Sequence, residues 1–182
     1  MNLADLSPTR GLPMFDEHRP PMAGERRRDM PRHVPAPLPL LPDAGDAAPV
    51  LSAIDRHLAL ARRTGQHLAV LAVHMEAPQG WAGNSALAQA FGQRLRSRVR
   101  ATDTVLWLGG RDFVALLLPC RHAGALAARQ RLIRMLSEIY RLDGEPASAS
   151  ARIGCACYPT AGDKASALLT AAMGARGFTP NQ

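Results

Sequence analysis

The stretch that decides the fold is residues 100–118, which read RATDTVLWLGGRDFVALLL. It holds two apolar runs, Thr104–Leu108 and Phe113–Leu118, each rich enough in β-branched, aromatic and aliphatic side chains to form a strand. The letters GGRD at 109–112 separate the runs, and paired glycines supply the positive φ values that a tight turn requires. The sequence therefore predicts a β-hairpin.

Regular hydrophobic spacing continues on both sides of this hairpin. Apolar residues at helical intervals predict helices, and unbroken apolar runs predict buried strands. The predicted helices span 51–64, 84–100, 126–140 and 165–175, and the predicted strands span 67–73 and 148–158. The order helix, strand, helix, hairpin, helix, strand, helix favours an α/β fold. We expect a two-layer sandwich of ferredoxin-like type, with a mostly antiparallel central sheet flanked by helices.

Residues 1–49 have a different character. They hold ten of the fifteen prolines and show no hydrophobic periodicity. Such a segment buries too little apolar surface to offset the entropy lost on ordering. We therefore predict a disordered Pro-rich tail over 1–49 and one folded domain over 50–178.

Three features bear on the cellular compartment. No apolar stretch approaches the ~18–20 residues that span a bilayer, so no transmembrane segment is expected. The N-terminus lacks the charged-then-apolar pattern of a signal peptide. The three cysteines, Cys120, Cys155 and Cys157, lack metal-ligand spacing and cannot all pair, which indicates reduced thiols. Together these features predict a cytoplasmic protein.

The net charge of +7 belongs to the second part of the chain. Residues 50–182 carry sixteen Lys or Arg against eight Asp or Glu, and Lys164 is the only lysine. The planar arginine fork suits phosphates and guanine edges, so an anionic partner is one reading. The composition of the genome is an alternative explanation for the preference of Arg over Lys.

From about Leu51 to Arg176 the chain resembles a GGDEF (diguanylate cyclase) domain. The resemblance rests on LAVLAV at 68–73, the helix end RLRSRVR, the hairpin LGGRDF, and RIGCACYP at 152–159 followed by Gly162. It implies the nucleotidyl-cyclase-like fold of that family. Because the hairpin reads GGRDF in place of GGDEF, the chain resembles a degenerate member of the family.

The resemblance also implies a damaged catalytic site. Active members join two GTP molecules into cyclic di-GMP with two Mg²⁺ ions, which carboxylates hold after the first strand and at the third hairpin position. His74 and Arg111 stand at those places here, and neither supplies the oxygen ligands that Mg²⁺ requires. Glu76 and Asp112 remain as carboxylates, but they do not restore both ligands. We therefore expect no catalytic residues and no bound metal or cofactor.

The guanine-reading loop after the first strand is altered as well. Here the segment 77–85 is several residues shorter than in the family, and its Phe-Lys-x-x-Asn-Asp and Gly-His elements have no counterpart. Gly83-Asn84 is the one candidate for the family's Gly-Asp pair. The resemblance therefore gives little support for GTP binding.

An inhibitory-site motif is retained. The family binds cyclic di-GMP through an Arg-x-x-Asp segment with five residues between it and the hairpin glycines, and Arg100 and Asp103 have this spacing to Gly109. An arginine fork can bind guanine O6 and N7 while the carboxylate accepts from guanine N–H groups. Arg131 lies close to the place of a further clamping arginine, with Arg129 and Arg134 beside it. A surface ion pair at a helix end is the alternative.

The expected function is a catalytically inactive cyclic di-GMP receptor or regulatory scaffold. Its expected partners are cyclic di-GMP and an unidentified protein, for which another GGDEF protein or an EAL protein is a candidate, and no nucleic acid. Two alternatives stay open. One is a cyclase with residual or hetero-dimer-dependent activity, which would need Mg²⁺ and GTP, and the other is a protein-interaction module that binds no nucleotide.

Overall fold

The computed structural model describes residues 47–81 and 84–177. Within them, helices and strands alternate in nearly the predicted order. The elements are α1 (Ala48–Thr64), β1 (Leu68–Glu76), η1 (Gln79–Trp81), α2 (Ser85–Arg98), β2 (Thr104–Gly109), β3 (Asp112–Leu117), α3 (His122–Leu136), β4 (Ile139–Leu142), β5 (Glu145–Ser148), β6 (Ser150–Tyr158), α4 (Ala165–Gly174) and η2 (Ala175–Gly177).

The central sheet has four strands in the order β2-β3-β1-β6, and every neighbouring pair is antiparallel. β1 lies between β3 and β6, where Val73 faces Phe113 on one side and Ile153 on the other. Six consecutive residues of β1, from Leu68 to Val73, are buried, as the unbroken apolar run predicted. The predicted α/β fold with an antiparallel sheet flanked by helices is confirmed.

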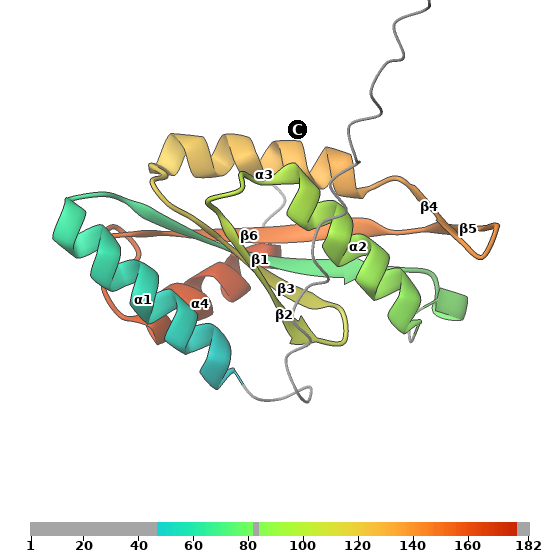
Figure 1. The fold of residues 1–182 in the computed structure, drawn as a ribbon, viewed down its shortest axis with the longest axis horizontal. Helices are drawn as coiled ribbons and strands as arrows, with labels where there is room; N and C mark the ends of the chain where they lie inside the picture. The colour runs from blue at the N-terminus through green and yellow to red at the C-terminus, as the bar shows by residue number, and fades with distance from the viewer. Residues whose placement is uncertain (1–46, 82–83, 178–182) are drawn as a thin grey trace, which may run out of the picture. The chain divides into compact units, whose positions relative to one another are not determined.

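Helices cover both faces of this sheet, with α2 and α3 on one side and α1 and α4 on the other (Figure 1). Alternate side chains of a strand point to opposite faces. Leu68 and Val70 therefore join the α1/α4 core, whereas Leu71 and Val73 join the α2/α3 core. The helices form two layers around the sheet, so the domain has three layers and not the two of the predicted sandwich.

The hairpin of β2 and β3 forms as its glycines predicted. Gly109 and Gly110 have φ values of 105° and 53°, in the region that favours glycine. Trp107 stacks on Phe113 with 5.8 Å between ring centroids, and its Nε1 donates to the carbonyl oxygen of Gly110 at 3.3 Å. The tryptophan packs against the hairpin that it precedes.

The predicted helix over 126–140 is wrong at both ends. α3 begins at His122 and ends at Leu136, and the chain then forms the β4–β5 hairpin. Tyr140 keeps the helical interval from Leu136, yet it lies on β4, where it is 2% exposed and donates from its hydroxyl to the Leu136 carbonyl at 2.8 Å. Ile139 is 66% exposed and does not share its face. The sequence signal for this second hairpin is Asp143-Gly144, a dipeptide that strongly favours a tight turn.

The predicted tail lies outside the described residues except at its end. Ala48 and Pro49 begin α1, with the proline in its first turn, where no intrahelical N–H bond is lost. The first helix therefore begins three residues before the predicted start at Leu51. Among residues 47–81 and 84–177, no helix is both long enough and apolar enough to cross a membrane.

Candidate functional site

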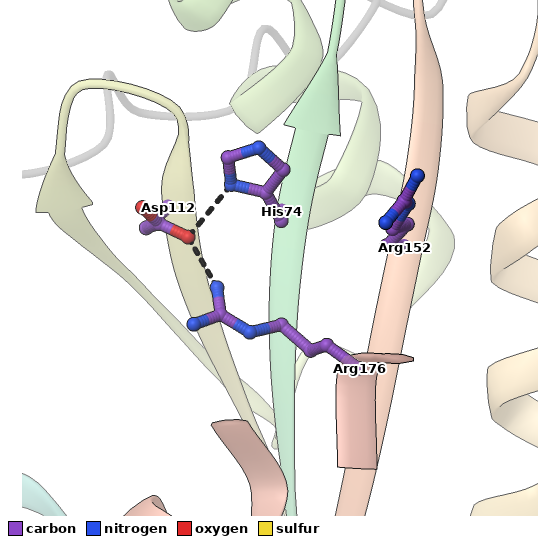
Figure 2. A pocket seen from close by; sticks show the side chains of 4 residues that line it. All are labelled: His74, Asp112, Arg152 and Arg176. Carbon is purple, nitrogen blue, oxygen red and sulfur yellow. Dashed lines mark hydrogen bonds and ion pairs between the residues drawn. The ribbon is translucent and has the colours of Figure 1, made fainter. Parts of the chain in front are cut away.

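A row of polar side chains crosses the sheet on its α1/α4 face. His74 on β1 lies directly opposite Asp112 on β3 and Arg152 on β6. Residues that pair across strands share a face, and Ala72, two residues before His74, belongs to the α1/α4 core. His74 Nδ1 and Asp112 Oδ1 are 3.0 Å apart. The antiparallel register alone therefore brings these three side chains together (Figure 2).

A fourth side chain, Arg176, reaches this row from η2. Its Nη1 donates to Asp112 Oδ1, and its Nε donates to the carbonyl oxygen of Met173 at 3.3 Å. This approach requires glycine at position 154 of β6, because a Cβ there would lie 1.9 Å from the carbonyl oxygen of Ala172. His74, Asp112, Arg152 and Arg176 together line a cavity of about 300 Å³.

The two carboxylates in this region are already paired. Asp112 Oδ1 contacts both His74 and Arg176. Glu76 Oε1 lies 2.7 Å from Arg152 Nε, and its Oε2 accepts from the Ser150 hydroxyl at 3.3 Å. A Mg²⁺ ion would have to displace a guanidinium at each carboxylate and then lie beside those positive charges.

The chain's residues therefore do not fit the metal that the resemblance implied. In the part of the chain that the structure describes, no group of three or more His, Cys, Asp or Glu side chains could hold a metal ion. Arg111, which was predicted to bring positive charge to this place, does not line the cavity. Its carbonyl oxygen accepts from the Met75 N–H at 2.8 Å, and the positive charge comes from Arg152 and Arg176 instead.

A second cavity, of about 340 Å³, lies on the α2/α3 side of the sheet. It brings together Arg100, Asp103 and Arg131, the three residues that were predicted to bind a ligand. The remaining lining residues come from the end of β3, the following loop and the first half of α3: Leu117, Pro119, Cys120, Arg121, Gly124, Ala127 and Ala128. Three arginines therefore face one carboxylate, beside a wall of small α3 side chains.

The turn that carries the Arg-x-x-Asp segment is fixed by its own hydrogen bonds. Asp103 Oδ2 accepts from the Arg100 N–H at 2.9 Å, and the Asp103 N–H donates to the Arg100 carbonyl at 3.1 Å. Arg96 clamps the same turn by donating to the carbonyls of Arg100 and Ala101. Asp103 is 7% exposed, whereas Arg100 and Arg131 are exposed. The turn thus positions the Asp103 carboxylate, which accepts from the Arg100 backbone and, among the described residues, forms no ion pair with the guanidinium group of Arg100 or Arg131.

Arg131 also has a structural contact at the edge of this cavity. Its Nη2 donates to the carbonyl oxygen of Arg98 at the end of α2, at 3.2 Å. Arg129, one of its predicted neighbours, donates from Nε to the Ile153 carbonyl at 2.6 Å and so belongs to the packing of α3 on β6. Of the candidate arginines on α3, only Arg131 lines the cavity.

The cysteines form a small thiol cluster near the same end of the sheet. Cys155 and Cys157 share a face of β6, as predicted, with 3.9 Å between their sulfur atoms. Hydrogen bonding from Cys155, with a further contribution from His122, lowers the pKa of Cys157 to about 6. Burial, followed by the nearby Cys157 and Asp103, raises the pKa of Cys120, which therefore stays protonated in the wall of the second cavity.

Asn84 has a structural role. Its side chain accepts from the Leu87 N–H at 3.0 Å and thereby caps α2. Gly83, the other half of the predicted guanine-reading pair, lies outside the described residues. The segment therefore begins α2, with Asn84 as its N-cap.

Comparison with known proteins identifies the relatives of this chain. A model of the family "Diguanylate cyclase, GGDEF domain" matches residues 49–175. The diguanylate cyclase TpbB of Pseudomonas aeruginosa is 38% identical over 90 residues, which are 48% of this chain and 20% of that protein. The bifunctional diguanylate cyclase/cyclic di-GMP phosphodiesterase MucR of Pseudomonas aeruginosa is 37% identical over 67 residues, 37% of this chain and 10% of that protein.

Solved structures resemble the domain over most of its length. The GGDEF domain of TpbB from Pseudomonas aeruginosa has a TM-score of 0.66 at 31% identity, covering 71% of this chain and 86% of that one. The active GGEEF domain of a diguanylate cyclase from Vibrio cholerae shares the fold, with a TM-score of 0.61 at 12% identity over 71% of this chain and 86% of that one. The chain spans a tenth to a fifth of the curated relatives it matches.

Proposed function

The chain belongs to the GGDEF (diguanylate cyclase) family, and we propose that it acts as a cyclic di-GMP receptor and not as a cyclase. One observation carries this proposal. Arg100 and Asp103 line a single cavity of about 340 Å³ with Arg131, which lies 28 residues beyond Asp103 in the chain. At the expected metal positions, in contrast, His74 and Arg111 replace carboxylates, and the remaining carboxylates Glu76 and Asp112 form ion pairs with arginine.

The chemistry of the cavity suits a guanine dinucleotide. The exposed Arg100 guanidinium can donate two parallel hydrogen bonds to O6 and N7 of a guanine. Asp103 uses Oδ2 for the backbone of its own turn, so Oδ1 is left to accept from guanine N–H groups. Arg121 and Arg131 add positive charge for the two phosphates of the ligand. The small side chains of Gly124, Ala127 and Ala128 leave room for a base against α3.

Binding would act on the cell through a protein partner. A ligand shifts an equilibrium only by binding one state more tightly than another, so the partner must distinguish the occupied receptor from the empty one. A second protein of the GGDEF or EAL type in the cytoplasm is the partner that we propose, because such proteins make or degrade the ligand. The exposed Arg100 and Arg131 would change their surroundings most on binding, so they mark the surface where the partner would sense it.

The test is calorimetric titration of the full chain with cyclic di-GMP. Loss of one bidentate guanine contact costs about 1–3 kcal/mol, roughly 5- to 150-fold in Kd, so Arg100→Ala and Asp103→Asn should both weaken binding by that much. Asp103→Asn keeps an oxygen acceptor for the Arg100 N–H and so preserves the turn. Arg134→Ala is the matched control, because it removes one exposed arginine from α3 outside the cavity.

GTP turnover with Mg²⁺ is measured in parallel on the same samples. Saturable binding that both variants weaken and the control retains, without turnover, supports the receptor. If the parent binds no cyclic di-GMP, the receptor proposal fails and a nucleotide-independent interaction module replaces it. Turnover above background, by the chain alone or mixed with a second GGDEF protein, would establish the cyclase alternative.

A further inference from the structure

A third cavity, of about 350 Å³, lies between α2 and β4. It shares no lining residue with the two cavities described above. Three arginines line it, two from α2 and one from β4: Arg94, Arg98 and Arg141. No carboxylate of the described residues lines it. The cavity therefore gathers positive charge from two elements and suits an anionic partner.

Arg94 is fixed in the wall of this cavity. Its Cζ lies 3.6 Å from the centroid of the buried Tyr140 ring, and its Nη2 donates to the carbonyl oxygen of Ile139 at 3.2 Å. Its Nη1 is 3.5 Å from Glu138 Oε2. Because these contacts tie the guanidinium to β4 and the residue before it, the charge of Arg94 stays beside the cavity whether or not a partner is bound.

The other two arginines are free to bind. The side chains of Arg98 and Arg141 are exposed, and in the described part of the chain neither guanidinium has a hydrogen bond or an ion pair. An arginine fork binds a carboxylate with two parallel hydrogen bonds. The cavity thus presents two unused forks, one from the end of α2 and one from β4.

The outer edge of β4 adds backbone groups to this surface. Among the described strands, β4 pairs only with β5, and Asp143-Gly144 forms the turn between the facing residues Leu142 and Glu145. Hydrogen-bonded and non-hydrogen-bonded pairs alternate along such a ladder, so the Arg141 N–H and carbonyl point away from Pro146, which has no N–H to offer. An edge of this kind can accept an added strand.

The neighbouring side chains favour a protein partner over a nucleic acid. Ile139 is 66% exposed and shares its strand face with Arg141, two residues later. Apolar side chains beside arginines are typical of protein interfaces. Glu138 and Glu145 are exposed near the same hairpin, and their carboxylates would repel a continuous phosphate backbone.

We propose that an extended acidic segment of a partner protein binds between α2 and β4. Its backbone would pair with Arg141 at the outer edge of β4, and its carboxylates would bind the guanidinium groups of Arg98 and Arg141. An apolar side chain of the segment would cover Ile139. The site shares no residue with the cyclic di-GMP cavity, so it does not rest on the proposed function and would serve a partner with or without that ligand.

The probe is a short fluorescein-labelled peptide in which glutamate alternates with valine, titrated with the full chain and followed by fluorescence anisotropy. We expect saturable binding that weakens by about 2- to 5-fold in Arg98→Gln and in Arg141→Gln, as for exposed ion pairs. Ile139→Glu sets a carboxylate beside the peptide and should weaken binding on the order of 10-fold. Arg63→Gln is the matched control, because it removes the same charge from the exposed face of α1.

Two altered peptides test the chemistry of recognition. Replacing each glutamate by glutamine should abolish binding, and N-methylation of alternate backbone nitrogens should weaken it, because both remove donors or acceptors that the site uses. All four substituted side chains of the protein are exposed, so circular dichroism should show the parent fold.

Three results would overturn the proposal. The first is no saturable binding of the glutamate peptide by the parent. The second is equal weakening in Arg63→Gln, which would indicate attraction to the net charge alone. The third is a single-stranded oligonucleotide that binds more tightly than the peptide and is weakened by the same variants, which would assign the surface to nucleic acid.

Discussion

Replacing Gly154 by alanine should displace the end of α4 from the sheet. A Cβ at this position would lie 1.9 Å from the Ala172 carbonyl oxygen, 2.7 Å from the Arg176 nitrogen and 2.9 Å from the Ala175 carbonyl carbon. All three atoms are backbone, so no side chain can rotate away. To reach even the closest separation that real Cβ atoms show, 3.0 Å, the Ala172 carbonyl must withdraw by roughly 1.1 Å.

The cost follows from what this movement disturbs. Overpacking a core usually costs about 1–3 kcal/mol, and a backbone obstacle places Gly154→Ala in the upper half of that range. We therefore expect the free energy of unfolding to fall by about 2–3 kcal/mol and Tm by roughly 6–12 °C. The displacement also draws Arg176 away from Asp112, whereas cyclic di-GMP binding on the other face should persist.

The assay is urea unfolding followed by circular dichroism, with Gly174→Ala as the matched control. Gly174 is the last residue of the same helix, and a Cβ there meets nothing within 4 Å. Alanine should leave stability unchanged at this position or raise it by up to about 1 kcal/mol. If Gly154→Ala were as stable as the parent, the close approach of η2 to β6 described above would be refuted.

Three further variants test the core, a helix cap and a buried phenol. Phe91→Ala should lower the free energy of unfolding, measured in urea, by about 3–5 kcal/mol, because the fully buried ring lies tilted 5.5 Å from the Phe113 ring and stacks 6.1 Å from the Tyr140 ring; a loss below 1 kcal/mol would contradict that packing. Asn84→Ala should cost about 0.5–2 kcal/mol in the same assay through the lost cap of α2, and Asn84→Ser should restore most of it. Burial, only partly opposed by Arg94, raises the pKa of Tyr140 from 10.0 to about 12, so the unfolded chain releases this proton first. The associated stability is fully present below pH 10 and is lost as pH rises toward 12; Tyr140→Phe should remove this part of the alkaline loss, and an unchanged pH profile would count against it.

Local chemistry explains what the sequence predicted well. The unbroken apolar run of β1 can be satisfied only by burial on both faces, and the structure buries it on both. Gly109 and Gly110 adopt positive φ values that other residues disfavour, so the sequence alone predicts the hairpin. Gly65 likewise ends α1 in the left-handed conformation, with φ of 64°.

The end of α3 could not be predicted from hydrophobic spacing. A continued helix and the observed turn into β4 both place a buried side chain four residues after Leu136. Tyr140 follows Leu136 by four residues and lies in the same core, but it reaches that core from β4. Hydrophobic periodicity records which side chains are buried and not the path of the backbone between them. The Asp143-Gly144 turn, with positive φ at both residues, was the distinguishing signal.

One candidate site could likewise be predicted from local sequence, whereas the other could not. Arg100 and Asp103 are close in sequence and keep their spacing, so a motif could find them. The cluster at Asp112 depends on contacts across the sheet and on Arg176, which is 64 residues away in the chain. The sequence around Arg176 does not indicate that this residue belongs to the cluster. The one sequence signal is Gly154, because glycine within a strand can indicate a close backbone approach.

The strand β3 joins the two cavities, with Asp112 at its first residue and Leu117 at its last. The residues between them are buried and paired on both sides, to β1 and to β2, so the strand has no side chain that can move freely. At about 3.4 Å per residue the two ends are roughly 17 Å apart. A ligand at one end therefore cannot be reported at the other by rearrangement along β3. The two cavities would therefore respond independently to whatever binds them, and only a partner that contacts both could combine their signals.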